Sequence, residues 1–206
     1  MHFKPLTKPA ELVLFEILNP RMSLSKDVLQ SYLSLKKGYE GEFMFASMAE
    51  KLQCECLILN GLLLEVNGTK FQIDSTMITQ KIIYMSEVKN FKSDFYFENE
   101  RFYLLDGTEQ KNPLLQLERS TSLLRQFFQN LNVTIPLESW IIFINPLFTL
   151  YQAPRNKPII LPNQVDRYLH KIDLFPSRLN EKHVKLAETL VSLHIEEPPY
   201  SRPASL

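Results

Sequence analysis

The chain has 206 residues, of which 45% are hydrophobic and 22% are charged, and its 23 basic residues balance its 23 acidic residues. This length and apolar content are enough to bury a full hydrophobic core. A formal net charge of zero argues against binding to nucleic acid through an overall positive field, although a local basic groove is compatible with a neutral total.

Two helices are predicted at the start of the chain. The first covers residues 10–18 and ends at Asn19-Pro20, because the residue before proline avoids the helical region. Ser25 is typical of an N-cap and predicts a second helix over residues 26–35, with an apolar face of Leu29, Tyr32 and Leu33. We expect both helices to form an arm that packs on the main domain and offers a surface for assembly into a homo-oligomer.

A further helix is predicted after Gly38 and Gly41, where apolar residues recur at i, i+3, i+4 and i+7: Phe45, Met48, Ala49 and Leu52. Glu42 extends this inward line by one turn, whereas Glu40 is rotated from it by about 200° and falls on the solvated face. Two interpretations of Glu42 stay open. It stabilises the first turn of the helix, as acids commonly do, or it points toward other acids in a site.

Three strands follow in a predicted antiparallel meander. Residues 54–66 form an extended apolar stretch that Asn60-Gly61 interrupts, and Asn67-Gly68 is a strong signal for a tight hairpin. Residues 71–78 and 82–89 are rich in β-branched and aromatic side chains, and the turn-like residues 79–81 join them.

Charged side chains lie on two neighbouring strands of this meander. Glu87 and Lys89 share one face of their strand, and Val88 between them is turned away. On the preceding strand, alternation places Asp74 on the same face as Gln72 and Thr76. Phe71, Ile73 and Met77 belong to the other face or to a twist of it. A buried acid costs several kcal/mol unless it is paired or bound to a cation. Either a salt bridge of Lys89 with Asp74 or Glu87, or a divalent-metal site with an attendant lysine, accounts for the pattern.

The second half of the chain predicts a hairpin, a helix and a buried strand. Aromatic and polar residues alternate over residues 91–97 and 101–105 around Asn99, and we favour packing over base stacking for these rings. Asn112-Pro113 begins a helix that has Gln116 in its first turn. The apolar run 140–144 has the length of a central strand reached by a helical crossover.

Two more helices, at residues 164–172 and 181–193, are predicted near the end of the chain, the second capped by Asn180, and the tail from Glu197 is expected to be disordered. Cys54 and Cys56 have no His or Cys companions at metal-site spacing, so we interpret them as free thiols. No leader-like segment opens the sequence and no apolar run approaches about 18 residues. We therefore expect a cytoplasmic protein with no membrane partner.

The segments GYEGE, QID, EVKN and NPLLQ, in this order and with these gaps, resemble the nuclease-related domain (NERD) family, a branch of the PD-(D/E)XK nuclease superfamily. The resemblance covers about residues 38–145. It implies an α/β fold with a PD-(D/E)XK nuclease-like core, made of a helix, a three-strand meander, a crossover helix and a further strand. We therefore expect a helical N-terminal arm over 1–36, the NERD domain over 37–162, and C-terminal helices and a tail over 163–206.

The same resemblance assigns catalytic residues by matching motifs. These matches are the helix acid Glu42, the metal aspartate Asp74, the Glu-x-Lys pair Glu87 and Lys89, and the glutamine Gln116. Many relatives have histidine after the aspartate, where this chain has Ser75. Strand alternation turns that position away, so its effect is expected to fall on auxiliary proton transfer rather than on metal binding.

These residue types suit a hard divalent cation. Asp74, Glu87 and the backbone carbonyl of Val88 are expected to hold Mg²⁺ or Mn²⁺ together with substrate phosphate. Lys89 is expected to stabilise charge on the phosphate or to help activate the attacking water. Arg119, three residues beyond Gln116, either contacts the nucleic-acid backbone or is solvated and paired with an acid, and both interpretations stay open.

The resemblance implies a metal-dependent nuclease that hydrolyses nucleic-acid phosphodiesters, most of all DNA, and leaves 5′-phosphates. Two alternatives remain: a nucleic-acid-binding or scaffolding module with little cleavage activity, and a nuclease directed at RNA. The complete set of Asp74, Glu87 and Lys89 favours an enzyme, because a module without catalysis is free to lose these costly charges.

Overall fold

The computed structural model of the protein describes residues 2–196. Within this range the elements are β1 (His2–Lys4), α1 (Ala10–Leu18), α2 (Lys26–Ala49), β2 (Leu57–Val66), β3 (Thr69–Ile78), β4 (Ile83–Lys89), β5 (Asp94–Glu98), β6 (Arg101–Leu104), β7 (Glu109–Gln110), α3 (Pro113–Asn130), β8 (Leu137–Phe143), β9 (Thr149–Tyr151), β10 (Ile159–Ile160), a 3₁₀ turn (Pro162–Gln164), α4 (Val165–Asp173) and α5 (Glu181–Ser192).

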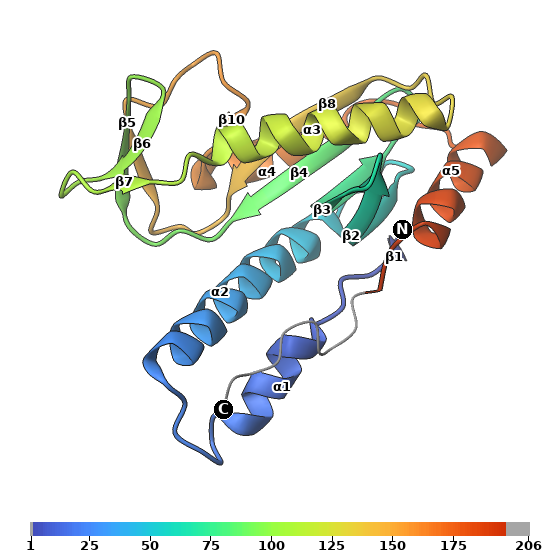
Figure 1. Ribbon diagram of the computed structural model, residues 1–206. Coiled ribbons are helices and arrows are strands. Elements are labelled where there is room, and N and C mark those ends of the chain that lie inside the picture. Colours follow the sequence, from blue (N-terminus) through green and yellow to red (C-terminus); the bar gives the residue numbers. More distant parts are fainter. Residues whose placement is uncertain (1, 197–206) are drawn as a thin grey trace.

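A six-stranded mixed sheet with the order β1-β2-β3-β4-β8-β10 forms the centre of the molecule (Figure 1). Helices α3 and α5 pack on one face, where Leu117, Phe128 and Ala187 are buried. Helices α2 and α4 pack on the other face, with Phe45 and Leu169 in a second core. The fold is therefore a three-layer α/β arrangement with helices on both sides of the sheet.

The order of elements expected for the central domain is observed. Strands β2, β3 and β4 form an antiparallel meander, and α3 then crosses over to β8, which pairs with β4 in parallel. Asn67 and Gly68 both have positive φ at the β2–β3 hairpin, as a tight turn of this kind requires. Asn112 caps α3 by accepting a hydrogen bond from the Leu114 N–H.

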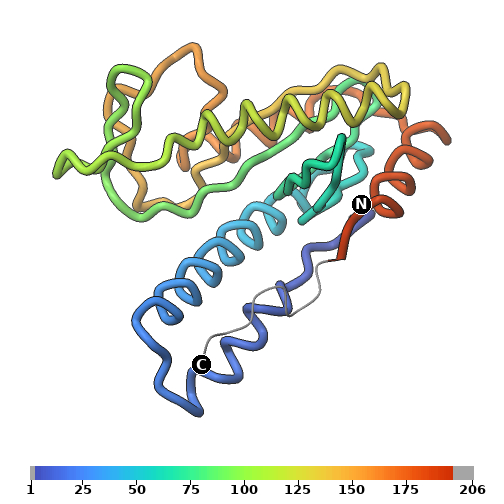
Figure 2. The backbone as a smooth tube through the Cα atoms, in the orientation of Figure 1, coloured from blue at the N-terminus to red at the C-terminus, as the bar shows by residue number. Residues whose placement is uncertain are grey.

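The predicted break between the helix at residues 26–35 and the helix after Gly38 and Gly41 is wrong, because α2 runs without interruption from Lys26 to Ala49 (Figure 2). Ser25 caps it as expected, by accepting from the Val28 N–H. The helix continues through Gly38 and Gly41 and crosses position 36, where we placed the end of the arm. Each interior glycine costs about 1 kcal/mol relative to alanine, and packing of the following turns on the sheet offsets that cost.

The expected apolar face of the early part of α2 is also only partly buried. Tyr32 is buried and lies beside Phe15 of α1, with ring centroids 5.8 Å apart. Leu29 and Leu33 are 37% and 50% exposed. The short helix α1 covers one side of α2 and leaves these two leucines on the open side.

Side-chain alternation shifts by one residue where β2 and β3 pair around Gly61. On β2, Leu59 and Leu62 both lie in the α3/α5 core, although they are an odd number of residues apart. Gly61 has φ of +61°, which glycine adopts without steric cost. On β3 the shift separates Ile73, in the α3/α5 core, from Met77, in the α2/α4 core. The expectation that Ile73 and Met77 share a face is therefore wrong.

A second sheet, with the order β7-β6-β5-β9, lies beyond the end of β4 (Figure 1). The predicted hairpin is present as β5 and β6, with Asn99 and Glu100 at positive φ in its turn. Phe102 and Phe148 stack on Phe143 of the large sheet, and Phe95 packs on both of them. The phenylalanine rings of this sheet form a core, as the packing interpretation predicted.

The C-terminal helices α4 and α5 match the predicted ranges closely, and Asn180 caps α5 by accepting from the Lys182 N–H. Cys54 and Cys56 are not joined in a disulfide, as expected. No helix among residues 2–196 is both long enough and apolar enough to cross a membrane. The predicted disordered tail from Glu197 lies outside the described residues.

Candidate active site

The site begins where the β3–β4 ladder ends. The last paired residues are Ser75 and Ser86, and beyond them the Asp74 carboxylate takes the place of a backbone partner, with Oδ2 accepting from the Val88 N–H at 2.7 Å. The N–H and C=O of one strand residue point to the same side. The Val88 carbonyl is therefore directed toward the side of β4 on which Asp74 lies.

Glu87, Lys89 and Gln116 form a closed hydrogen-bonded group on the α3 face of β4. Lys89 Nζ donates to Glu87 Oε1 at 2.7 Å and to Gln116 Oε1 at 3.0 Å, and Gln116 Nε2 donates to the same Glu87 oxygen. The Glu87 residue is only 2% exposed. The ion pair allowed by the sequence is thus present, and it joins Lys89 to Glu87.

Helix α2 brings Glu42 to this end of the sheet. Glu42 is half-buried and lies close enough to Glu87 and Lys89 to interact with both electrostatically, whereas Glu40 is exposed. The predicted rotation of the helix is confirmed. Asp74 and Gln116, the other two predicted catalytic residues, also lie beside Glu87 and Lys89. The structure therefore brings all five predicted catalytic residues together.

Three residues that were not predicted to belong to the site position α2 there. Asn90 Nδ2 donates to the Lys37 carbonyl at 2.8 Å, and Asn145 Nδ2 donates to Asn90 Oδ1 at 2.8 Å. A Cβ on Gly41 would lie 2.6 Å from the Asn90 Cβ, so only glycine permits this approach. In the sequence, the signal for such a close approach is a glycine inside a helix, next to Glu42 and on the side of the helix that faces inward.

The concentration of acids governs the electrostatics of the site. Burial and the neighbouring Glu87 raise the pKa of Glu42 to about 7, and Lys89 opposes the rise. Burial, followed by the charges of Glu87 and Glu42, raises the pKa of Asp74 well above its usual range, against the Val88 N–H and Lys89. The single positive charge of Lys89 does not neutralise three carboxylates, whereas a bound cation would supply the missing positive charge.

The donor set fits a hard divalent ion that keeps part of its water shell. Among residues 2–196, no group of three or more His, Cys, Asp and Glu side chains is arranged to hold a metal ion. Mg²⁺, however, is commonly held by one or two carboxylates with waters and substrate phosphates. Asp74, Glu87 and the Val88 carbonyl supply a set of that kind.

Two further residues lie at the margins of the site. Ser75 is buried and pairs with Ser86, whose side chain lies on the α2/α4 face of β4 together with Tyr84 and Val88. The side chains of paired residues share a face, so that of Ser75 is directed away from Glu87. Arg119 is exposed on α3. No acid forms an ion pair with it in the described part of the chain, which leaves its guanidinium open to solvent.

The fold and the site define an α/β protein with carboxylate, amine and amide groups gathered where the pairing of β3 with β4 ends. The chain belongs to the nuclease-related domain (NERD) family, whose model matches residues 37–144. That range includes all five candidate residues and extends from α2 through β8. No curated protein and no solved structure matches the chain.

Proposed function

We propose that this protein is a metal-dependent nuclease that hydrolyses DNA phosphodiester bonds with a PD-(D/E)XK nuclease-like core. The observation that carries the proposal is the convergence of Asp74, Glu87, Lys89, Gln116 and Glu42, in a member of a nuclease-related family. The order of α2, the β2–β4 meander, α3 and β8 supports the same core.

The chain supplies a place for the cation and fixes the groups around it. Asp74, Glu87 and the Val88 carbonyl would hold Mg²⁺ or Mn²⁺, which polarises the phosphodiester and favours attack by water. Gln116 and Lys89 both bond Glu87 Oε1, and this leaves Oε2 for a further partner. The orientation of Glu87 is thus set before substrate binds.

Lys89 and Glu42 have distinct roles in this proposal. The Lys89 ammonium has three N–H donors, and two of them bond Glu87 and Gln116, so the third is available for a phosphate oxygen. There it stabilises the charge that develops in the transition state. The pKa of Glu42, about 7, suits a group that orients water and accepts its proton near neutral pH.

Cleavage assays test the proposal directly. The purified protein is incubated with supercoiled, linear and single-stranded DNA and with RNA, each in Mg²⁺, Mn²⁺ or EDTA. We expect cleavage of DNA that leaves 5′-phosphates and stops in EDTA. Binding without cleavage would instead indicate a binding or scaffolding module, and cleavage of RNA alone would indicate an RNA-directed nuclease.

Lys89→Ala is expected to abolish cleavage while the protein stays folded, because the amine acts on transition-state charge. Lys70→Ala is a matched control, since Lys70 is exposed near the start of β3, four residues before Asp74. Turnover by Lys89→Ala at the wild-type rate would remove Lys89 from the mechanism.

Asp74→Asn is expected to reduce the rise in melting temperature that Mg²⁺ or Mn²⁺ produces. A ligand that binds only the folded state stabilises it by mass action, so a lost ligand group lowers that gain. Thermal unfolding is measured with and without each ion, and Asp94→Asn on the exposed surface of β5 serves as the control. A metal response equal to that of the wild type would exclude Asp74 as a ligand.

A further inference from the structure

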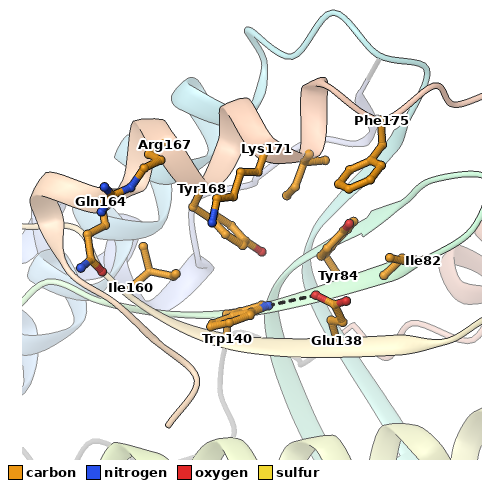
Figure 3. Close-up of a pocket in the computed structure, with 11 residues that line it drawn as sticks. Ile82, Tyr84, Glu138, Trp140, Ile160, Gln164, Arg167, Tyr168, Lys171 and Phe175 are labelled. Carbon is orange, nitrogen blue, oxygen red and sulfur yellow. Dashed lines mark hydrogen bonds between the residues drawn. The ribbon is translucent and has the colours of Figure 1, made fainter. Parts of the chain in front are cut away.

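A cavity of about 470 Å³ opens on the α4 side of the large sheet (Figure 3). Its walls include Tyr84, Trp140, Tyr168 and Phe175, with Arg167 and Lys171 above them on α4. Tyr84 and Tyr168 belong to the α2/α4 core, whereas Glu87 and Lys89 face α3. The cavity is therefore separate from the candidate active site.

The walls offer aromatic surface to a ligand. The rings of Trp140 and Tyr168 are tilted, with centroids 5.9 Å apart, and Tyr84 meets Tyr168 edge-on at 6.5 Å. Phe175 is 65% exposed and stands at the mouth. An exposed ring beside a fixed aromatic group is an arrangement that stacks on a planar ligand at modest entropic cost.

The two walls of the cavity carry opposite charges. Arg167 and Lys171 lie four residues apart, on one face of α4, and neither forms an ion pair within residues 2–196. Figure 3 shows Lys171 extending toward Trp140, with Arg167 beside Gln164. Glu138 lies on the other side of Trp140 and accepts from its Nε1 at 3.4 Å. The cavity thus has cations on its α4 wall and an acid on its β8 wall, with aromatic rings on both walls.

We propose that this cavity binds a nucleotide. The base stacks among Trp140, Tyr84 and Phe175, and the phosphate contacts Arg167 and Lys171. Glu138 accepts a hydrogen bond from an exocyclic amino group, which favours bases that carry one over thymine. The volume lies within the range of small-ligand sites.

The nucleotide can be free or part of a single strand. A second cavity of about 360 Å³ shares Tyr84 and Phe175 with the first and continues past Lys81 and Ser177. It gives a strand a path away from the nucleotide. The inference does not depend on cleavage, because no residue that lines the cavity belongs to the candidate active site.

Trp140 makes the test direct, since it is the only tryptophan in the chain. The full-length protein in EDTA is titrated with dAMP, dTMP, deoxyadenosine and a short oligo(dA), and tryptophan fluorescence is followed. A parallel titration of N-acetyltryptophanamide corrects for absorbance by the ligands. We expect a saturable change with dAMP, and binding at least about tenfold weaker with deoxyadenosine, which lacks the phosphate, or with dTMP, which lacks the exocyclic amino group.

Variants of cavity residues test whether the change in tryptophan fluorescence arises from binding in the cavity. Phe175→Ala, and Arg167→Gln combined with Lys171→Gln, are each expected to raise the Kd for dAMP by about tenfold. Lys185→Gln, on the exposed surface of α5, should leave it unchanged. Phe175 is exposed, so its replacement keeps the core intact.

The outcomes separate this inference from the proposed nuclease activity. Tighter binding of oligo(dA) than of dAMP identifies a strand as the ligand, and equal binding identifies the free nucleotide. The absence of saturable binding by either, or binding that all the cavity variants retain, would overturn the inference even if the protein cleaves DNA. Nucleotide binding by a protein that cuts no substrate would sustain it alone.

Discussion

The carboxylate of Glu87 is held by two hydrogen bonds to one of its oxygens. Lys89 and Gln116 both bond Oε1, and the residue is nearly inaccessible to solvent at 2% exposure. A buried ionised acid requires compensation of this kind. The same contacts fix the geometry of a ligand or catalytic group, because partners around a metal ligand commonly set its orientation.

Exchanging glutamate for glutamine at positions 42 and 40 separates two acids of the same helix. Glu42→Gln is expected to reduce single-turnover cleavage much more than Glu40→Gln, since only Glu42 reaches Glu87 and Lys89. Both changes preserve volume and remove one charge. Rates are measured at saturating Mg²⁺, and equal losses would mean that Glu42 takes no part in the reaction.

Arg119→Ala is expected to weaken DNA binding similarly for all sequences and to make its salt dependence shallower by about one unit of slope. A single lost phosphate contact has this signature. Binding is measured over a salt series without divalent ions, and Arg125→Ala, an exposed residue further along α3, is the control. If neither affinity nor slope changes, Arg119 makes no contact with the nucleic acid.

Helix α2 connects the N-terminal arm to the site as one rigid element. It crosses Asn90, the residue after β4, so closely at Gly41 that a Cβ there would lie 2.6 Å from the Asn90 Cβ and 3.4 Å from Ile144 Cγ2. The next residue is Glu42. The closeness of this crossing therefore sets how far Glu42 reaches toward Glu87.

Gly41→Ala and Gly38→Ala make a matched pair on this helix. Gly41→Ala is expected to destabilise the protein and reduce cleavage, because its methyl group would lie 2.6 Å from the Asn90 Cβ. Gly38 has nothing within 4 Å of the equivalent position, so Gly38→Ala should raise stability by about 0.5–1 kcal/mol. Thermal unfolding and single-turnover rates check both, and equal effects would show that the crossing tolerates a side chain.

Local signals predict the strands and their turns, and contacts between distant elements explain what the sequence missed. Asn67-Gly68 and Asn112-Pro113 act within a few residues, so the hairpin and the start of α3 follow directly from them. The shift of alternation at Gly61 depends on the pairing of two strands. The continuity of α2 depends on the sheet beneath it, which no local pattern contains.

The candidate site likewise contains residues that short motifs predicted and residues whose roles depend on contacts between distant segments. The resemblance assigned Asp74, Glu87 and Lys89 through short motifs, and strand alternation placed Glu87 and Lys89 on one face. The roles of Asn90 and Asn145 were not predicted, because they arise from a contact across 55 positions in sequence. The aromatic cavity was missed for the same reason, since α4 and β8 meet only in the folded chain.

Segments near both ends of the chain close the outer side of the large sheet. Strand β1 pairs with β2 at Ile58 and Leu59, and Lys4 Nζ donates to the carbonyls of Asn60 and Gly61 at 2.8 and 3.1 Å. Further along β2, the Leu63 N–H donates to His194 Nδ1 at 3.0 Å, and the Leu63 carbonyl accepts from Ile195 N–H. An open strand edge is a site of aggregation, and these contacts cover it.

Acidification is expected to weaken the attachment of residues 194–195. Burial and the nearby Lys4 charge lower the pKa of His194, so the unfolded chain binds a proton at His194 more readily than the folded chain does. Stability therefore falls as pH drops below about 6.5, the usual histidine value, and stops falling below the folded pKa. A protonated Nδ1 also cannot accept from the Leu63 N–H.

His194→Asn tests this, because an amide oxygen accepts a hydrogen bond but does not titrate. Melting temperature and hydrogen exchange at Leu63 are compared at pH 7.5 and 5.5 in both proteins. The other three histidines are the same in both proteins, so the difference between the two proteins reports on position 194. The wild type should lose more protection at Leu63 on acidification than the variant. Equal losses would place the pH-sensitive contact elsewhere, because the edge at Leu63 would then be closed independently of the charge on His194.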